Sequence, residues 1–527
     1  MDAILSSLIY PSAIIQYHWW YMHKILMVIS EAPPIMSGIS KVGARLKSGL
    51  EALGHQIDVL SVQDIPRLAI GEVRLSSMLW RAPKLLLRRL DEYDIVHIHG
   101  PVPTFSDVAL LFSALRPNSS TPVVYTHHSE IDLRSLRLIC DIYNYTHKQF
   151  ARLADQVLVS TPAYAERLRR YVPDEYVSVV PWGVDDGWYD SHQQKNEQFT
   201  VLFVGQLRPY KGLDTLLGAM GRLRGVELQI VGGGHEEQHY RSLVAERGLD
   251  NVIFRGKLGD TELFEAFSRS HVIALPSTTH AEAFGLVLLE GMLARCVPVV
   301  SQLPGVTDVV GDAGFSFPVG NEAALATILA RLRDDAQLLD EYSERARVRA
   351  RQFSWQRTIG WHSALYDRLI SLKRFGSELR TAEGPDSALG TLLRDTVSTL
   401  GASTGSIMMI DHDTEQLYVR AIAGLPVEFK NNLPQRLGQG IAGLVALRNQ
   451  PLLLPQGFSA FAGLGEGMYL QRDHIQSSLS VPIRTTERTL GVINLSSHDD
   501  GAQFDADALD WLDTLGQRAG HLLRSSR

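Results

Sequence analysis

The chain has 527 residues, which is more than one ordinary hydrophobic core can organise, so several domains are expected. Apolar residues make up 45% of the chain and charged residues 21%, which excludes a collagen-like or largely disordered protein. The formal net charge of −7 argues against nucleic-acid binding, and two cysteines are too few for a disulfide framework, so a cytoplasmic protein is expected.

Residues 1–21 contain an apolar stretch with no preceding Lys or Arg and no small-residue cleavage site, so a signal peptide is not indicated. The stretch is also too short to span a bilayer. A buried-strand pattern begins only at residue 24. Two interpretations stay open: residues 1–21 are a loose apolar extension, or Met22 is the natural start.

Short runs rich in Val and Ile alternate with longer helical patterns from residue 24 onward, which is typical of parallel sheets covered by helices on both faces. A polar, turn-rich stretch at residues 185–198 separates two series of strands. We therefore predict two doubly wound, Rossmann-like α/β domains, at residues 22–190 and 191–372, whose strand ends open toward a shared crevice. The expected strands cover residues 24–30, 57–61, 95–99, 123–127, 156–160 and 177–180, then 200–204, 227–231, 252–254, 272–275 and 298–301.

A third domain is expected after a linker at residues 373–387, where Gly and Pro break a helical pattern. Helical patterns at 388–400 and 506–523 flank strands with hairpin-like spacing, which predicts an α+β domain over residues 388–527. Its expected strands lie near residues 406–410, 417–423, 478–483 and 490–496.

Two carboxylates eight residues apart, Glu282 and Glu290, follow a predicted strand. Gly285 between them predicts that Glu282 lies in a loop and Glu290 on a helix. The unpaired amides and positive dipole at a helix N-terminus suit a diphosphate. Surface carboxylates in contact with water also fit this spacing, so the motif alone leaves both interpretations open.

A basic loop follows the first strand of the second series. Gly205 ends that strand, and Arg208 and Lys211 follow within seven residues, at the sheet edge where phosphates bind in doubly wound folds. A basic loop that faces only water is the alternative.

In their order along the chain, the motifs over residues 24–372 resemble those of glycosyltransferase family 4. The members of this family are retaining nucleotide-sugar enzymes of the GT-B fold. The resemblance is carried by Pro33-Pro34 with Ser37-Gly38, by residues 54–59 (GHQIDV), 94–100 (DIVHIHG), 126–130 (THHSE) and 181–185 (PWGVD), and by residues 205–212 (GQLRPYKG) and 282–290 (EAFGLVLLE).

The resemblance implies that two cations neutralise the donor diphosphate, that Glu290 holds the ribose, and that Glu282 with two backbone amides contacts the transferred sugar. His128 resembles the family histidine near that sugar, and Gly38 the glycine that lets the backbone approach the phosphate. The implied catalytic residues are Glu282, His128, Lys211 and Arg208, and the implied substrate-binding residues are Gly38, Gly205, Phe284, Gly285 and Glu290. We expect no cofactor and no essential metal.

Three positions depart from the family pattern. Gln206 stands where the family usually has Arg, so Arg208 must act from two residues further on. Ser37 replaces the first glycine of the usual pair, and residues 291–298 (GMLARCVP) differ from the small residue and Gly that the family tends to have.

Two further patterns have alternative interpretations. His97 and His99 lie on one face of a predicted strand and could bind a metal with His128, although a structural or substrate-facing role fits better because no carboxylate or thiol accompanies them. Residues 67–89 carry six cations and one carboxylate among apolar residues, which predicts either a helix that touches anionic lipid or an ordinary amphipathic surface helix.

The third domain resembles a GAF domain, a small ligand-sensing fold, through residues 438–443 (GQGIAG), 478–483 (SLSVPI), 490–495 (LGVINL) and Phe504-Asp505. Both cysteines lie outside it, so a thioether-linked chromophore is excluded. Its ligand is open, and a purely structural or dimerising role is the alternative.

The sequence as a whole predicts a retaining glycosyltransferase. It moves a hexose from a UDP- or GDP-linked donor to a carbohydrate or lipid-linked acceptor, with a peripheral contact at the inner membrane face as a further expectation. The alternative is a nucleotide-sugar sensor with little or no transfer, which the departures at Gln206 and Ser37 favour. An epimerase or phosphorylase fits less well, because no pyridoxal-type lysine motif is present.

Overall fold

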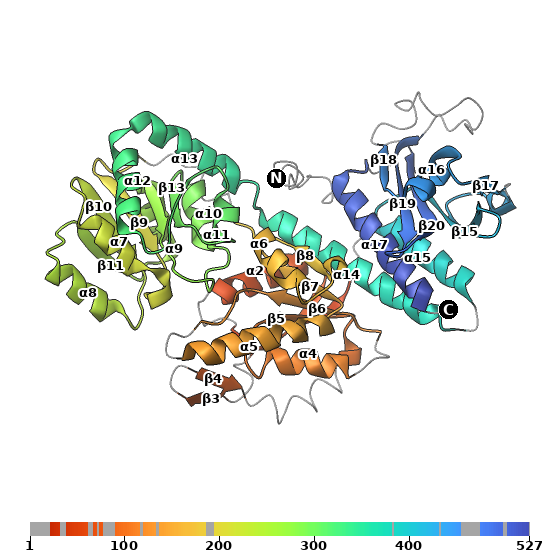
Figure 1. Ribbon diagram of the computed structural model, residues 1–527, viewed down its shortest axis with the longest axis horizontal. Coiled ribbons are helices and arrows are strands. Elements are labelled where there is room, and N and C mark those ends of the chain that lie inside the picture. Colours follow the sequence, from red (N-terminus) through yellow and green to blue (C-terminus); the bar gives the residue numbers. More distant parts are fainter. Residues whose placement is uncertain are drawn as a thin grey trace.

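The computed structural model describes residues 22–31, 38–61, 67–70, 73–76, 90–115, 120–132, 136–185, 194–381, 384–431, 434–454, 475–498 and 503–525. Three six-stranded sheets and one two-stranded hairpin lie within these residues, and the three sheets follow one another along the chain (Figure 1). The extension at residues 1–21, Pro33-Pro34 and Ser37 lie outside the described residues. The domain limits expected from the sequence stay predictions.

The first sheet is parallel, with the strand order β2-β1-β5-β6-β7-β8. Alternate residues of β1 point into two separate hydrophobic cores. Met27 lies in the core that contains residues of α2, and Val28 lies in the core that contains residues of α4, so helices cover both faces of the sheet. This confirms the predicted doubly wound architecture. Its elements are β1 (Lys24–Ile29), α2 (Gly38–Ala52), β2 (Gln56–Ser61), β5 (Ile95–Gly100), α4 (Ser106–Ala114), β6 (Val123–His127), α5 (Arg137–Phe150), β7 (Gln156–Val159), α6 (Pro162–Arg169) and β8 (Val177–Val179).

The second sheet repeats this plan, with the order β11-β10-β9-β12-β13-β14. The strand order reverses at β9, between β10 and β12, which is the kind of position where open α/β sheets bind ligands. The three-residue strand β14 was not predicted, because so short a run carries no periodic signal. The elements are β9 (Phe199–Val204), α7 (Leu213–Met220), β10 (Val226–Val231), α8 (Glu237–Glu246), β11 (Val252–Gly256), α9 (Asp260–Arg269), β12 (Val272–Leu275), α10 (Leu286–Leu293), β13 (Val297–Ser301), α11 (Val306–Val310), β14 (Phe315–Phe317), α12 (Glu322–Asp334) and α13 (Ala336–Ala350).

A long helix, α14 (Trp355–Glu378), leads back from the second sheet to the first. Its N-cap is Ser354, whose side chain accepts a hydrogen bond from the Arg357 amide, and Ser354 also forms a bridge with Val184 just after the first sheet. From there α14 runs along the first lobe toward the third sheet, between the two in Figure 1. The chain therefore ends its second Rossmann-like lobe by packing against the first.

The third sheet is antiparallel, with the order β17-β16-β15-β20-β19-β18. α15 and α17 pack on one face of it, and α16 packs on the other. This agrees with the predicted α+β fold. The elements are α15 (Pro385–Thr399), β15 (Thr404–Asp411), β16 (Gln416–Ala423), β17 (Gln435–Arg436), α16 (Gly440–Arg448), β18 (Leu452–Leu454), β19 (Ile475–Arg484), β20 (Thr489–His498) and α17 (Ala506–Ser525).

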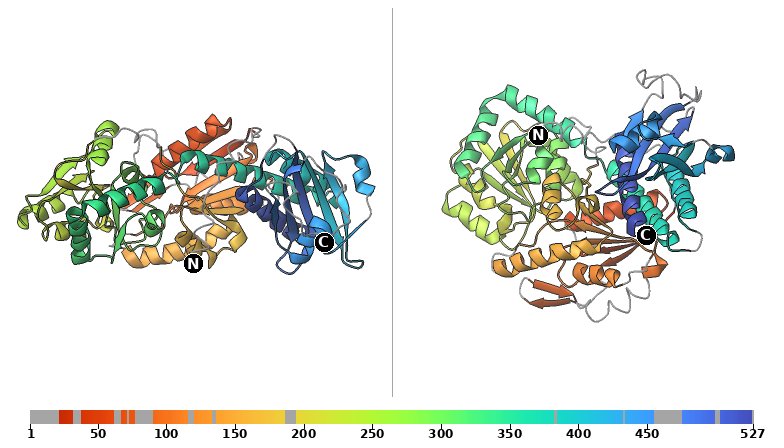
Figure 2. Two further views of the ribbon diagram at one scale, coloured as in Figure 1. Left: turned by 90° about the horizontal axis from the view of Figure 1, so that it is seen from above. Right: turned by 45° about the vertical axis from the view of Figure 1, so that its right-hand side comes forward.

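The closing helix α17 joins the third sheet to the first lobe (Figure 2). The indole Nε1 of Trp511 donates to the Ala364 carbonyl on α14 at 2.9 Å. Arg518 is 9% exposed and donates to the Gln156 side chain and to the Asp155 carbonyl, each at 2.9 Å. The GAF-like domain is thus docked through buried polar contacts rather than tethered by a linker alone.

The helix predicted at residues 67–89 is wrong for its described part. Residues 67–70 and 73–76 form strands β3 (Arg67–Ile70) and β4 (Val73–Ser76) of an antiparallel hairpin. Gly71 and Glu72 separate the two strands, and the alternating pattern RLAI and VRLS satisfies a two-residue period as well as a helical one. Residues 77–89 lie outside the described part of the chain.

Replacing Arg518 should loosen the docking of α17. In Arg518→Ala, the Gln156 side chain and the Asp155 carbonyl lose a charged donor, which should weaken the contact by about 2–4 kcal/mol. Hydrogen–deuterium exchange should show faster exchange in β7 and α17. Arg524→Ala, which changes an exposed arginine of the same helix, is the matched control. Unchanged protection in Arg518→Ala would show that the docking does not depend on this side chain.

Candidate functional site

The carboxyl edges of the two parallel sheets face each other, and two contacts join them. The Ala163 amide, at the start of α6, donates to Asp308 Oδ2 on α11 at 2.9 Å. The Tyr164 hydroxyl donates to the His280 carbonyl in the loop between β12 and α10. The loops that follow the strands of both lobes therefore meet, as predicted for a shared crevice.

The basic loop after β9 is held against the loop after β12. Its 3₁₀ turn (Pro209–Lys211) ends at Gly212, which has φ +69°, and a Cβ there would lie 1.9 Å from the Pro276 carbonyl oxygen. Only glycine fits this approach. The turn brings Lys211 to Glu282, and the two form an ion pair although 71 positions separate them.

The Lys211–Glu282 pair is shielded from water. The two side chains are 13% and 11% exposed, and the Ser277 hydroxyl donates to Glu282 Oε2 at 3.2 Å. Burial disfavours the charged ammonium, but the attraction of Glu282 outweighs it, so the net effect raises the pKa of Lys211. Lys211 is therefore fully charged at neutral pH.

Glu290 lies on α10, and Glu282 lies in the turn before it, as predicted from Gly285. Gly285 has φ +76° and starts the helix, with Leu275 and Leu288 closing the space where a side chain would be. Burial raises the pKa of Glu290, and Lys41 opposes this shift. Because Lys41 belongs to α2 of the first lobe, the two lobes face each other at Glu290 as well.

His128 belongs to a group of four histidines, His97, His99, His128 and His362, that we call the histidine cluster. His128 Nε2 and His99 Nδ1 are 2.9 Å apart, and the His97 and His99 rings lie 4.2 Å apart. The His128 ring also stacks on Trp182, with 5.5 Å between ring centroids. Burial lowers the pKa of His128 to about 4, so its ring is neutral at pH 7.

The histidine cluster is organised by hydrogen bonds. His97 Nδ1 lies 2.8 Å from the Tyr366 hydroxyl on α14, and His97 Nε2 lies 2.7 Å from the Thr126 hydroxyl, so both ring nitrogens are engaged. The described residues contain no group of three or more His, Cys, Asp or Glu side chains suited to a metal ion. The hydrogen bonds of His97 fit a structural role, whereas the role of His99 stays a prediction, since its buried Nε2 meets no hydrogen-bond partner among the described residues.

The other candidate residues differ in their position and in how far they are buried. Gly38 starts α2, and Gly205 lies beside Lys211, whose Cε is 3.7 Å from the position of a Cβ on Gly205. Phe284 is 5% exposed and packs edge-on against Phe353. Arg208 is exposed at the rim of the loop, next to the exposed Gln206. The structure thus brings Lys211 and Glu282 together but leaves Arg208 at the rim.

Several neighbours of these residues were not predicted. They are Lys41, Tyr164, Arg167 and His280, which lie on three different segments, α2, α6 and the loop between β12 and α10. Sequence spacing contains no signal that joins them, apart from the position of His280 two residues before Glu282.

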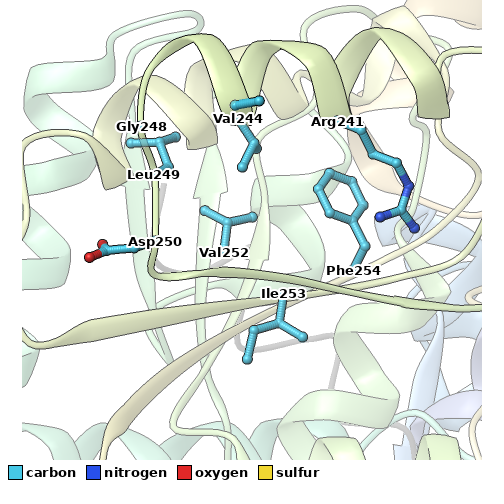
Figure 3. A pocket seen from close by; sticks show the side chains of 9 residues that line it. Arg241, Val244, Gly248, Leu249, Asp250, Val252, Ile253 and Phe254 are labelled. Atoms are coloured by element: carbon cyan, nitrogen blue, oxygen red, sulfur yellow. The ribbon is translucent and has the colours of Figure 1, made fainter.

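A surface hollow of about 590 Å³ lies elsewhere on the second lobe (Figure 3). It is formed by α8, β11 and the loop between them, with the Arg241 guanidinium 4.4 Å from the centre of the Phe254 ring. The α8–β11 loop lies at the amino edge of the sheet, opposite the crevice. The hollow is therefore separate from the candidate site.

Comparison with known families covers most of the chain. Residues 36–188 match the model described as Glycosyltransferase Family 4, residues 186–349 match Glycosyl transferases group 1, and residues 382–524 match a GAF domain. The O-antigen chain mannosyltransferase C of Escherichia coli is 30% identical over 371 residues, which are 65% of this chain and 97% of that protein. The chain belongs to the family 4, group 1 glycosyltransferases.

Other similar proteins agree with this membership. The D-rhamnosyltransferase WbpZ of Pseudomonas aeruginosa is 30% identical to this chain, over 50% of this chain and 70% of WbpZ. The sucrose-phosphate synthase of Thermosynechococcus elongatus has a similar structure, with a TM-score of 0.56 at 20% identity over 66% of this chain and 99% of that one. This likeness confirms the GT-B fold.

Among the described residues, none of the helices has the length and apolar character that crossing a bilayer requires.

The buried histidines should make the stability of the glycosyltransferase fall in mild acid. Burial lowers the pKa of His362 to about 4, so the unfolded chain binds a proton near pH 6.5 while the folded chain does not. This one group should remove about 1 kcal/mol of unfolding free energy between pH 6.5 and 5.5. In His362→Asn, whose amide replaces the Nδ1 contact to the Thr358 carbonyl, urea unfolding should depend less on pH. His239→Asn, which changes an exposed histidine, should have the same pH dependence of the unfolding free energy as the wild type. An equal pH dependence in all three proteins would contradict the role given to His362.

Proposed function

We propose that the protein transfers a hexose from a nucleoside-diphosphate sugar to a carbohydrate or lipid-linked acceptor, with retention at the anomeric carbon. The observation that carries the proposal is the Lys211–Glu282 pair, which is buried at the crevice between the two lobes, next to the start of α10. The relatives named above transfer mannose and rhamnose, which supports a hexosyl donor.

Donor binding would rearrange the pair. A diphosphate that enters the crevice offers Lys211 a stronger partner than one carboxylate, and Arg208 at the rim adds a second cation. Glu282 is then free to accept hydrogen bonds from the hydroxyls of the sugar. Because negative charge develops on the leaving diphosphate, these cations are the main stabilising element of the transition state, and no metal ion is needed for that role.

The remaining residues position the donor and the sugar. Glu290 accepts hydrogen bonds from the ribose hydroxyls, and the amides near Phe284 and Gly285 face the donor at the N-terminus of α10. His128 is neutral and donates a hydrogen bond without adding charge. No protein nucleophile is assigned, and the leaving phosphate accepts the proton of the acceptor.

The GAF domain is proposed to regulate transfer or to mediate dimerisation. Its helix α17 contacts α14, and α14 carries His362, a member of the histidine cluster, and Tyr366, which contacts His97. A change in the docking of α17 thus has a direct structural route to the crevice. The second candidate, a nucleotide-sugar sensor without transfer, is favoured by Gln206 at the position of the usual family arginine.

Removing Lys211 should abolish transfer. With a panel of nucleotide sugars, wild-type protein should release a nucleoside diphosphate from one donor, and Lys211→Ala should be slower by about 100-fold or more because the leaving group loses its buried cation. Lys430→Ala, which changes an exposed lysine of the GAF domain, is the control. Thermal stabilisation by a donor without nucleotide release in any acceptor extract would favour the sensor.

Removing Glu290 should weaken binding of the nucleoside portion. In Glu290→Ala, a free nucleoside diphosphate should stabilise the protein less than it stabilises the wild type, because stabilisation follows occupancy by mass action. The thermal midpoint measured over a ligand titration gives both dissociation constants. Equal constants would place the ribose away from α10.

A further inference from the structure

A second group of cations faces the crevice from the first lobe. Lys148 on α5 and Arg167 on α6 share one carboxylate, Glu130, with 2.6 Å from Lys148 Nζ to Glu130 Oε1 and 3.7 Å from Arg167 Nη2 to Glu130 Oε2. The side chains of Lys148 and Glu130 are 13% and 17% exposed. Two cations around one carboxylate leave one positive charge without a carboxylate partner among the described residues.

Two buried nitrogen atoms in this region lack hydrogen-bond partners. They are Arg167 Nη1 and His280 Nδ1, neither of which meets an acceptor or donor among the residues that the structure describes. A buried polar group without a partner costs about 1–3 kcal/mol, so such atoms are rare unless something else binds them. Both atoms are thus available to a ligand.

The two atoms come from opposite lobes, and Tyr164 contacts both residues, with the Arg167 guanidinium 5.8 Å from the centre of the Tyr164 ring. Arg167 is on α6 of the first lobe, and His280 is in the β12–α10 loop of the second, which the Tyr164 hydroxyl fixes beside α6. Burial lowers the pKa of His280, Arg167 and Lys148 lower it further, and Glu130 opposes this shift. α6 stands between the lobes in Figure 1.

This group adjoins the donor site without belonging to it. His280 precedes Glu282 by two residues, and Arg167 and Lys148 also contribute to the lowered pKa of His127, the neighbour of His128. The group therefore lies on the side of the first lobe, next to the loop that carries Glu282. The proposed function assigns Lys211 and Arg208 to the donor diphosphate, which leaves the charge of this group for another substrate.

We propose that Arg167, Lys148 and His280 bind a phosphate group of the acceptor. This inference rests on the proposed transfer reaction, because it assigns the acceptor to the same crevice. The guanidinium, the ammonium and a neutral imidazole supply several donors to a tetrahedral anion, and the anion neutralises the excess positive charge. Arg167 is the cation that the anion recruits, since its contact with Glu130 is already long at 3.7 Å.

The role of Glu130 sets this proposal apart from a purely structural ion pair. In a structural pair, removing Glu130 only weakens the local fold. In a phosphate site, Glu130 competes with the ligand for both cations, so its removal strengthens anion binding. Glu130→Gln keeps the shape and removes the charge.

The test is phosphate binding to the full-length protein with the donor site filled by an excess of nucleoside diphosphate. Inorganic phosphate should bind to the wild type, about tenfold or more weakly to Arg167→Gln, and more tightly to Glu130→Gln. Arg169→Gln changes a cation of the same helix that pairs with Asp174 at the surface, and it should behave as the wild type. Equal affinity in wild type, Arg167→Gln and Glu130→Gln, or no binding to the wild type, would overturn the proposal.

Binding of two further ligands distinguishes the possible sources of the phosphate group. Glucose 6-phosphate represents a sugar phosphate, and vesicles of phosphatidylglycerol in phosphatidylcholine represent a lipid phosphate. Loss of binding in Arg167→Gln to only one of them assigns the acceptor class. Donor turnover without any effect of Arg167→Gln on phosphate binding would refute this site alone, whereas phosphate binding without turnover of any donor would refute the transfer reaction alone.

Discussion

The packing of α14 is the constraint on which the rest of the structure depends. The helix starts where Ser354 meets Val184, and its buried face places Tyr366 and His362 beneath the first sheet. The Ala364 carbonyl of the same helix accepts a hydrogen bond from Trp511 of α17. One helix therefore sets the position of the second lobe, supports the histidine cluster and carries the GAF domain. Any change in how α17 sits on α14 reaches residues that surround the crevice.

The crevice is organised by unequal charge on its two sides. On the second lobe, Lys211 is balanced by Glu282, and a donor diphosphate has to replace that carboxylate. On the first lobe, Glu130 balances only one of Lys148 and Arg167. His128 of the histidine cluster is neutral, because burial lowers its pKa to about 4. The site thus offers positive charge at two separate points, one on each lobe.

Much of the fold could be predicted, because strands and helices follow from neighbouring residues. The pattern around Gly285 correctly placed Glu282 in a loop and Glu290 on a helix, since Gly285 lies between them and precedes the helix with φ +76°. The segment from Arg67 shows the limit of this reasoning. Its charges and apolar residues fit a helix and a hairpin equally, and the pairing of β3 with β4 decided between them.

Local periodicity and glycine positions are enough to predict the order of the elements, the three-part organisation and the residue types at the carboxyl edges of the strands. The contacts between distant side chains follow from the packing of the folded chain. Lys211 and Glu282 are separated by 71 positions, and Arg167 and His280 come from different lobes. No local pattern encodes such contacts, because they arise from the way the two sheets and α14 pack against one another.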